Sequence, residues 1–420
     1  MFLTALAWLL AGVVLTAAYF AITHRRRTPY LDLDIDRLPP LDQGLETISG
    51  CTGGVVLGGN RVEVFHNGGL FPAALADIEA ARHSVHLETF VWNPGRIEDQ
   101  LVEALSKSAT RGVDVRVLID AIGGSTASAG ALEKLAGAGV QVSFYCRPRW
   151  WNFRRFNHRT HRKLLIVDGQ VAYTFGHGIA DQWLGDAEDE HHWRDTGVRI
   201  EGPAAFALQS VFAENWMEEA KCVPAGERCF PKIEPKGDIG VHVVSSQSGE
   251  ADSSVALLYT LAIASARKEV IIQNPYFAPD EGMCELLGLM VRRGVAVHLM
   301  VPGKQTDSPF VRLASRHLYG RLLEAGVRLY EFQPTLLHQK VVIVDGVWSH
   351  VGSTNLDSRS LALNEEVGVG ILDAGVASRL RDAFTADLRR SIELNLQRWR
   401  KRPLLARGSS WLAYRLHDQL

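Results

Sequence analysis

The sequence has 420 residues, and its 45 lysines and arginines nearly balance its 47 aspartates and glutamates, which leaves a formal net charge of −2. This balance argues against a histone-like protein that binds polyanions through bulk charge. Apolar residues make up 46% and charged residues 22% of the chain, a globular composition that excludes wholesale disorder. The length predicts two or three domains, each with its own core.

The N-terminus begins with an apolar stretch, Phe2 to Ile22, that contains no charged residue. At helical rise this stretch spans about 31 Å, the thickness of a bilayer core. Arg25 to Arg27 follow it and no basic residue precedes it, so the positive-inside rule predicts a single-pass anchor over residues 1–24 with the rest of the chain in the cytoplasm. A cleaved signal peptide is the alternative, but the basic n-region is missing and the apolar core is too long. The acidic, proline-bearing segment that follows predicts a linker over residues 25–58.

The rest of the chain repeats itself once. Ala80 to Leu87 resembles Ser265 to Ile272, and each marks a helix end followed by a short strand. A helix, a strand and a further strand follow in both copies, at Ile97 to Arg111, Val113 to Ile119 and Val140 to Tyr145, and at Glu281 to Arg293, Val295 to Val301 and Val327 to Phe332. This alternation predicts an α/β fold of two duplicated halves, residues 59–225 and 226–396, each a mixed β-sheet flanked by helices.

Each half carries the motif H-x-K-x4-D. Its residues are His161, Lys163 and Asp168 in the first half and His338, Lys340 and Asp345 in the second. Two copies at matched places cannot be accidental. An imidazole can attack phosphorus or protonate a departing oxygen, and a lysine stabilises charge on phosphate oxygens. We expect the aspartates to orient the site by charge-assisted hydrogen bonds. Because neither half holds both histidines, the active site is predicted at the interface of the halves.

The two motifs and the string from Gly352 to Glu366 (G-S-x-N-L-D-x-R-S-x-x-x-N-x-E) resemble the phospholipase D superfamily and, within it, the bacterial cardiolipin synthases. The likeness covers roughly Asn60 to Leu396. It implies a nucleophile and a general acid/base at His161 and His338, with the nucleophile usually in the first half. The phosphate-binding residues that it implies are Lys163, Lys340, Ser353 and Asn355.

The first half departs from this pattern, because Phe175 to Gly178 stand opposite Gly352 to Asn355. The hydroxyl and the amide of a symmetric phosphate cradle are therefore missing there. Room for substrate at Gly178, or backbone N–H groups in place of the amide, are the two interpretations. The neighbouring His177 is more typical of a packed or solvated histidine than of a site residue.

Two carboxylates occupy equivalent strands further on, Asp195 in the first half and Glu366 in the second. A carboxylate that accepts a hydrogen bond from one ring nitrogen of a histidine fixes the tautomer of that ring. We expect each carboxylate to orient the histidine of its own half.

The sequence gives no metal-site signal, since it contains no CxxC pair and no HExxH motif. Cys222 and Cys229 are close enough in sequence to bridge, but reduced thiols are the simpler interpretation. The acidic run Asp186 to Glu190 beside His191 and His192 lacks a regular ligand spacing, which favours a solvated loop. We therefore expect no metal and no cofactor.

Basic residues gather in two runs that also contain aromatic residues. Arg147 to Lys163 has seven basic residues, Arg398 to Arg415 has six, and neither run has an acidic one. Such mixtures suit single-stranded nucleic acid or an anionic membrane surface. The apolar N-terminus favours a membrane partner and no nucleic acid, and residues 397–420 are predicted to form a basic amphipathic tail.

Two classes of function fit these observations. The first is a phosphatidyltransferase of a bacterial-type inner membrane that converts two phosphatidylglycerol molecules into cardiolipin and glycerol through a phosphatidyl-histidine intermediate. Water in place of the second lipid would give phospholipase D hydrolysis. The second class is a nuclease of the same superfamily, which would use the same histidines on DNA or RNA. An inactive lipid-binding protein is a third alternative, but it would be expected to have eroded motifs, and none is eroded. The sequence makes no prediction of oligomeric state.

Overall fold

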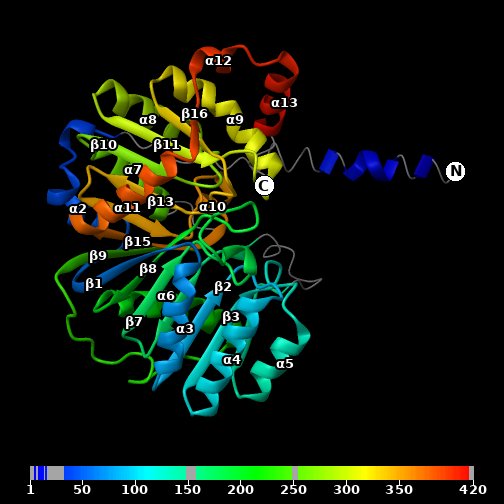
Figure 1. Ribbon diagram of the computed structural model, residues 1–420, viewed down its shortest axis with the longest axis vertical. Helices are drawn as coiled ribbons and strands as arrows, with labels where there is room; N and C mark the ends of the chain where they lie inside the picture. The colour runs from blue at the N-terminus through cyan, green and yellow to red at the C-terminus, as the bar shows by residue number, and fades with distance from the viewer. Residues whose placement is uncertain are drawn as a thin grey trace.

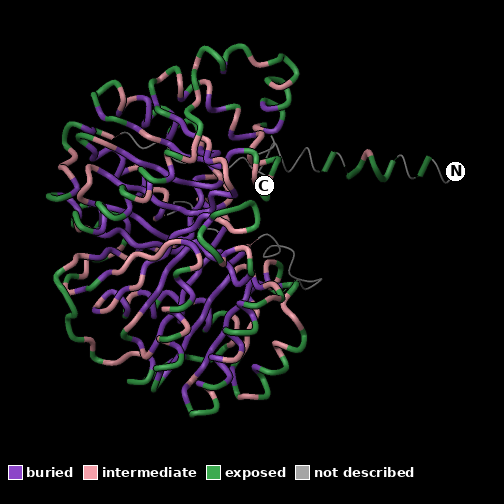
Figure 2. The backbone as a smooth tube through the Cα atoms, viewed as in Figure 1, coloured by how far each residue is buried: buried purple, intermediate pink, exposed green. Residues whose placement is uncertain are grey.

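The computed structural model describes residues 4–5, 8–13, 15–16, 33–147, 158–247 and 254–415. Two α/β halves lie one above the other in Figure 1. Their strands form one continuous mixed sheet, and buried residues run through both halves and across the junction (Figure 2). The predicted α/β class with two similar halves and mixed strand directions is confirmed.

The first half supplies seven strands in the order β4-β3-β2-β6-β7-β8-β1, with β2, β3 and β4 parallel and the others antiparallel. Its strands are β1 (Val56–His66), β2 (Ser84–Thr89), β3 (Asp114–Asp120), β4 (Gln141–Tyr145), β6 (Leu164–Val167), β7 (Val171–Phe175) and β8 (Thr196–Glu201). Its helices are α3 (Leu70–Ala80), α4 (Arg96–Thr110), α5 (Ala129–Gly137) and α6 (Ala204–Ala220), with short 3₁₀ turns η2 (Asn67–Gly69) and η4 (Asp181–Trp183). The two-residue β5 (Arg159–Thr160) pairs instead with β15 of the second half.

The second half repeats this order as β12-β11-β10-β13-β14-β15-β9, with β16 added at the edge. Its strands are β9 (Ile239–Ser246), β10 (Glu269–Gln273), β11 (Ala296–Pro302), β12 (Arg328–Phe332), β13 (Val341–Val344), β14 (Trp348–Gly352), β15 (Asn364–Leu372) and β16 (Ser391–Glu393). Its helices are α7 (Ser254–Ala264), α8 (Glu281–Arg292), α9 (Pro309–Glu324), α10 (Ser358–Ala362) and α11 (Ala374–Leu388), followed by α12 (Leu396–Arg400) and α13 (Leu404–Arg415). The antiparallel pair β1–β9 joins the two halves.

The local sequence explains why these elements form. β6 and β13 are unbroken runs of Leu, Ile and Val, and every residue in them is buried, as expected of strands covered on both faces. α4 buries Ile97, Leu101 and Leu105, which recur on one helical face. The chain turns after α4 at Gly112, where φ is +89°, a conformation that glycine adopts without a steric penalty.

The predicted linker over residues 25–58 is wrong for its described part. Residues 33–58 form η1 (Ile35–Arg37), α2 (Leu41–Cys51) and the start of β1. Leu41, Leu45 and Ile48 of α2 are almost fully buried in the core of the second half. Their i, i+4, i+7 spacing is that of an amphipathic helix, and Pro40 stands at the N-cap, so the prolines mark a helix start rather than an extended linker.

The predicted membrane anchor, Phe2 to Ile22, lies largely outside the described residues. Those of its residues that are described are helical. Among the helices that the structure describes, none combines the length and the apolar composition needed to cross a bilayer. The anchor therefore stays a prediction.

Two buried histidines give the fold a pH dependence. His242 of β9 and His350 of β14 both pair with Gly370 of the intervening β15. Burial lowers the pKa of His242 to about 4 and that of His350 to about 3. The unfolded chain therefore binds more protons below the ordinary histidine pKa of 6.5, and stability is lost as the pH falls from there toward 4.

We expect the free energy of unfolding to decrease by up to about 1.4 kcal/mol per pH unit for each of these histidines. Urea titrations at pH 7, 6 and 5 would measure this slope. His350→Gln removes one titrating group, so its slope should be shallower than that of the unmodified chain. Equal slopes would contradict the assignment of this pH dependence to His350.

Candidate active site

The two motif histidines lie where the halves meet. The backbone N–H of His161 donates to the carbonyl of Glu365 at 2.9 Å, next to the β5–β15 pairing. The backbone N–H of His338 donates to the carbonyl of Arg194 at 2.7 Å, next to an isolated bridge between Arg194 and Leu337. Each histidine is thus hydrogen-bonded through its backbone to the other half.

The orienting carboxylates are exchanged between the halves. His161 Nδ1 lies 3.0 Å from Glu366 Oε1, and His338 Nδ1 lies 2.7 Å from Asp195 Oδ2. The expectation that each carboxylate serves the histidine of its own half is therefore wrong. The backbone pairing just described explains this, because it brings each histidine beside the carboxylate strand of the opposite half.

The histidine pKa values suit a nucleophile and a proton carrier. Burial lowers the pKa of both His161 and His338 to about 4, against the opposing pull of their carboxylates. Both rings are therefore neutral near pH 7. In His161, a hydrogen bond from Nδ1–H to the carboxylate fixes the tautomer whose Nε2 lone pair is free, which is the form that attacks phosphorus. In His338, Nε2 lies 3.1 Å from Lys340 Nζ.

The motif lysines lie beside their histidines. Lys163 Nζ donates to the carbonyl of His161 at 2.8 Å, and Lys340 Nζ donates to the carbonyl of His338 at 2.5 Å. Burial, joined for Lys163 by repulsion from Lys340, lowers the pKa of Lys163 to about 7 and that of Lys340 to about 8. A bound phosphate would favour the charged form of both.

Ser353 and Asn355 lie in the turn between β14 and α10. The Ser353 hydroxyl donates to Glu366 at 2.5 Å, and Ser360 donates to the same carboxylate at 2.7 Å. Ser353 thus supports the orienting carboxylate in this structure. Asn355 is 4% exposed, and its buried Oδ1 has no hydrogen-bond partner among the described residues.

Asp168 and Asp345 do not join this group. The carboxylate of Asp168 accepts hydrogen bonds from the backbone N–H groups of residues 82–84, and Asp345 accepts those of residues 267–269. A whole strand separates each aspartate from its lysine, roughly 16 Å at strand rise. The prediction that they orient the site is corrected: they hold the turns before β2 and β10.

Aromatic side chains that the motif analysis missed surround the histidines. Trp183 and Trp193 lie with ring centroids 5.3 and 5.5 Å from that of His338. Phe90 lies 5.3 Å from His161 in an edge arrangement. The tryptophans belong to the loop between β7 and β8, on either side of the acidic run, and no motif marks them. His177 is packed against Phe71 and Phe175, as its sequence context predicts.

Two buried ion pairs tie the halves together beneath the site. Arg162, between the motif histidine and lysine, contacts Glu365 at 2.8 Å. Arg194 contacts Asp387 at 3.0 Å. Each pair joins one half to the other, so the relative position of the two histidines is fixed by charge-assisted hydrogen bonds.

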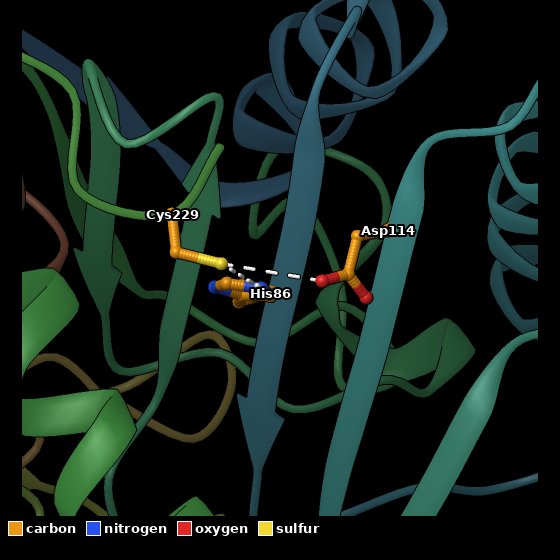
Figure 3. Close-up of side chains that lie close together, drawn as sticks. All are labelled: His86, Asp114 and Cys229. Atoms are coloured by element: carbon orange, nitrogen blue, oxygen red, sulfur yellow. Dashed lines mark hydrogen bonds between the residues drawn. The ribbon is translucent and has the colours of Figure 1, made fainter. Parts of the chain in front are cut away.

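Two further clusters contain metal-ligand residue types. His86, Asp114 and Cys229 lie together on the first half (Figure 3), with Cys229 Sγ 4.0 Å from both His86 Nε2 and Asp114 Oδ2. Asp114 is already paired with Arg116 at 2.8 Å, which supplies the compensating charge. Glu188, Asp189 and His192 lie together in the acidic loop and are largely exposed. Cys222 and Cys229 are both free thiols.

The match to known proteins covers both halves. The family described as "Cardiolipin synthase, PLD-like domain" matches residues 74–209 and 259–388. The chain belongs to this family. It is 33% identical to a cardiolipin synthase of Listeria innocua over 358 residues, 84% of this chain and 74% of the relative. It is also 33% identical to a cardiolipin synthase of Oceanobacillus iheyensis over 346 residues, 82% and 72% of the two chains.

Solved structures agree with this family at the level of the fold. The phosphatidylserine synthase of Haemophilus influenzae superposes with a TM-score of 0.69 at 12% identity, over 88% of this chain and 98% of that one. A polyphosphate kinase of Porphyromonas gingivalis gives a TM-score of 0.55, also at 12% identity, over 94% of this chain and 56% of its own. The chain therefore shares its fold with these two structures.

Proposed function

We propose that this chain is a phosphatidyltransferase that joins two phosphatidylglycerol molecules into cardiolipin and releases glycerol. The observation that carries the proposal is the pair of buried imidazoles, each oriented by a carboxylate of the opposite half. Membership of the cardiolipin synthase family supplies the substrate class.

The first step transfers a phosphatidyl group to the protein. His161 Nε2 attacks phosphorus, the bond from phosphorus to the terminal glycerol oxygen breaks, and His338 gives that oxygen a proton. The approach of the phosphodiester anion raises the pKa of His338 and so favours the protonated ring. Lys163, Lys340 and Asn355 stabilise the charge on the phosphate oxygens.

The second step regenerates the enzyme. A hydroxyl of the second phosphatidylglycerol loses its proton to His338 and attacks phosphorus, and the bond to His161 breaks. Water in place of that hydroxyl would give phosphatidic acid. Because Trp183, Trp193 and Phe90 line the histidines, the apolar wall favours a lipid hydroxyl over water.

The lipid substrate implies that the site works at a membrane. We place the catalytic body on the cytoplasmic side of a bacterial-type inner membrane, since Arg25 to Arg27 follow the predicted anchor. An anionic phospholipid and the bilayer are therefore its partners.

Purified chain with phosphatidylglycerol as the sole lipid tests the activity. Mass spectrometry should find cardiolipin and glycerol in equal amounts, because one glycerol leaves for each cardiolipin formed. Phosphatidic acid as the main product would make the protein a hydrolase. DNA cleavage without lipid turnover would overturn the lipid assignment altogether.

A further inference from the structure

The C-terminal helix α13 presents an apolar face away from the protein. One side of the helix packs against α9 and buries Ser410 and Ala413. Four large apolar side chains recur at i, i+1, i+7 and i+8, the spacing of one helical face. They are Leu404, Leu405, Trp411 and Leu412, and they are 79%, 89%, 49% and 57% exposed. We call these four residues the apolar stripe.

Positive charge accompanies the apolar stripe. Residues 396–415 contain six arginines and lysines and no acidic residue. The guanidinium of Arg415 lies 5.4 Å from the centre of the Trp411 ring. Leucine and tryptophan beside cationic groups suit the boundary of an anionic bilayer, where apolar side chains enter the acyl region and guanidinium groups meet phosphates.

The position of α13 connects the stripe to the active site. The Tyr414 ring packs against His317 of α9 in a tilted arrangement, with ring centroids 4.9 Å apart. α9 begins eight residues before that histidine, about 12 Å along the helix axis. Just before α9, Asp307 accepts a hydrogen bond from Tyr276 at 2.5 Å, and the Tyr276 ring lies 6.5 Å from that of His338. α13 thus packs on α9 (Figure 1), and the N-terminal end of α9 leads through Asp307 and Tyr276 to His338.

We propose that α13 is an interfacial helix that seats the rim of the active site on a bilayer containing anionic phospholipid. The proposal rests on the proposed function, because the substrate lipid is itself anionic and lies in that bilayer. Its occupant is the lipid surface rather than a second protein.

The test compares lipid bilayers with detergent micelles. Leu405→Asp with Leu412→Asp places two charges in the apolar stripe of the full chain. We expect cardiolipin formation on phosphatidylglycerol vesicles to fall about 10-fold, because the charged helix no longer enters the interface. The rate on phosphatidylglycerol dispersed in detergent should not change. Val223→Asp, at an apolar position that is 65% exposed after α6, is the matched control.

The outcomes separate this proposal from the assignment of activity. Unchanged vesicle activity in the double variant would overturn the interfacial role. Absence of cardiolipin formation by the unmodified chain in micelles would overturn the proposed function instead. Brominated phosphatidylglycerol should quench less fluorescence in Trp411→Phe than in the unmodified chain, and equal quenching would count against insertion.

A second, independent inference concerns Trp183 in the first half. Its indole N–H donates to Asp195 Oδ2 at 2.8 Å, as the Ser353 hydroxyl donates to Glu366 in the second half. A side chain on Gly176, which matches Ser353, would place its Cβ 2.2 Å from Asp195 Oδ1. The Asp195 carboxylate thus fills the space that a serine side chain would need at position 176. The Trp183 indole supplies the hydrogen-bond donor that the serine hydroxyl supplies in the second half.

The same ring closes the position that matches Asn355. A Cβ on Gly178 would lie 2.8 Å from Cζ3 and 2.9 Å from Cη2 of Trp183, so no asparagine fits there beside the indole. The missing amide of the first half therefore has a physical reason: the indole ring occupies its place. Of the two matching positions, both among the described residues, the second half alone therefore holds an amide, Asn355.

We infer that Trp183 is a positioning residue that orients His338 through Asp195. The charged groups that act on His338 are Lys340, Asp195 and Asp307, and His177 and Lys340 act in turn on Asp195. Loss of the indole donor would leave more negative charge on Asp195 and stabilise the imidazolium of His338.

Trp183→Phe removes the N–H group and keeps an aromatic wall. We expect kcat to fall about 10-fold with KM unchanged, and the limb of the pH profile of kcat that reports His338 to move to higher pH by about half a unit. Trp193→Phe is the matched control, because it alters the neighbouring ring and leaves the Asp195 donors in place; it should leave that limb unshifted. A stability loss in Trp183→Phe with an unshifted limb, or an equal shift in Trp193→Phe, would overturn the inference.

Discussion

Replacing His338 with alanine is expected to leave a phosphatidyl group on His161. The test uses a phosphatidyl ester of p-nitrophenol, whose leaving group departs without a proton. The first step then proceeds without His338, whereas the second step still needs a base to activate the acceptor hydroxyl. A burst of p-nitrophenol should therefore appear, followed by steady turnover about 10³–10⁴-fold slower than in the unmodified chain. Mass spectrometry of the trapped protein should place the adduct on His161.

The matching variant, His161→Ala, should give neither burst nor adduct, because the attacking nitrogen is gone. His191→Ala is the matched control, since this side chain is 80% exposed in the acidic loop and contacts neither motif histidine among the described residues. It should behave as the unmodified chain. An adduct in His161→Ala and none in His338→Ala would reverse the two roles.

Much of this site is predictable from the sequence. The motif repeats at matched places in two similar halves, and each half contains one of the two histidines. An active site that needs both histidines must therefore lie between the halves. The strands predicted at Val113 to Ile119 and Val295 to Val301 differ by one residue from β3 and β11. In both segments apolar residues recur at every second position, the alternation that favours a strand.

The exchange of carboxylates was not predictable in this way. It depends on the two-residue β5 pairing with β15 and on the bridge between Arg194 and Leu337. These contacts join residues that lie far apart in the chain, and no local pattern encodes them. For Asp168, in contrast, the sequence alone argues against a position beside Lys163. The four residues between them form a strand, which places the aspartate well beyond hydrogen-bond reach of the lysine. The buried residues of α2 have the spacing of a helix, whereas the acidic, proline-bearing segment before them has the composition of a linker.

The second large loss of activity is expected from changes to the two exchanged carboxylates, Asp195 and Glu366. Amide variants keep the size of each side chain and remove its charge, so the histidine loses its fixed tautomer and the stabilisation of its charged form. In catalytic triads of other enzymes such a change costs about 10⁴-fold in kcat. We expect losses of about 10²–10⁴-fold for both Asp195→Asn and Glu366→Gln.

The p-nitrophenol ester shows which of the two histidines each carboxylate orients. Glu366→Gln should resemble His161→Ala, with no burst, because the attacking ring is no longer held. Asp195→Asn should resemble His338→Ala, with a burst and slow turnover. Asp168→Asn is the control: it removes charge from a carboxylate that holds only backbone N–H groups, so it should lower stability and leave the burst intact. If each carboxylate served its own half, Asp195→Asn would abolish the burst and Glu366→Gln would keep it. The crossed pairing in the structure requires the opposite result.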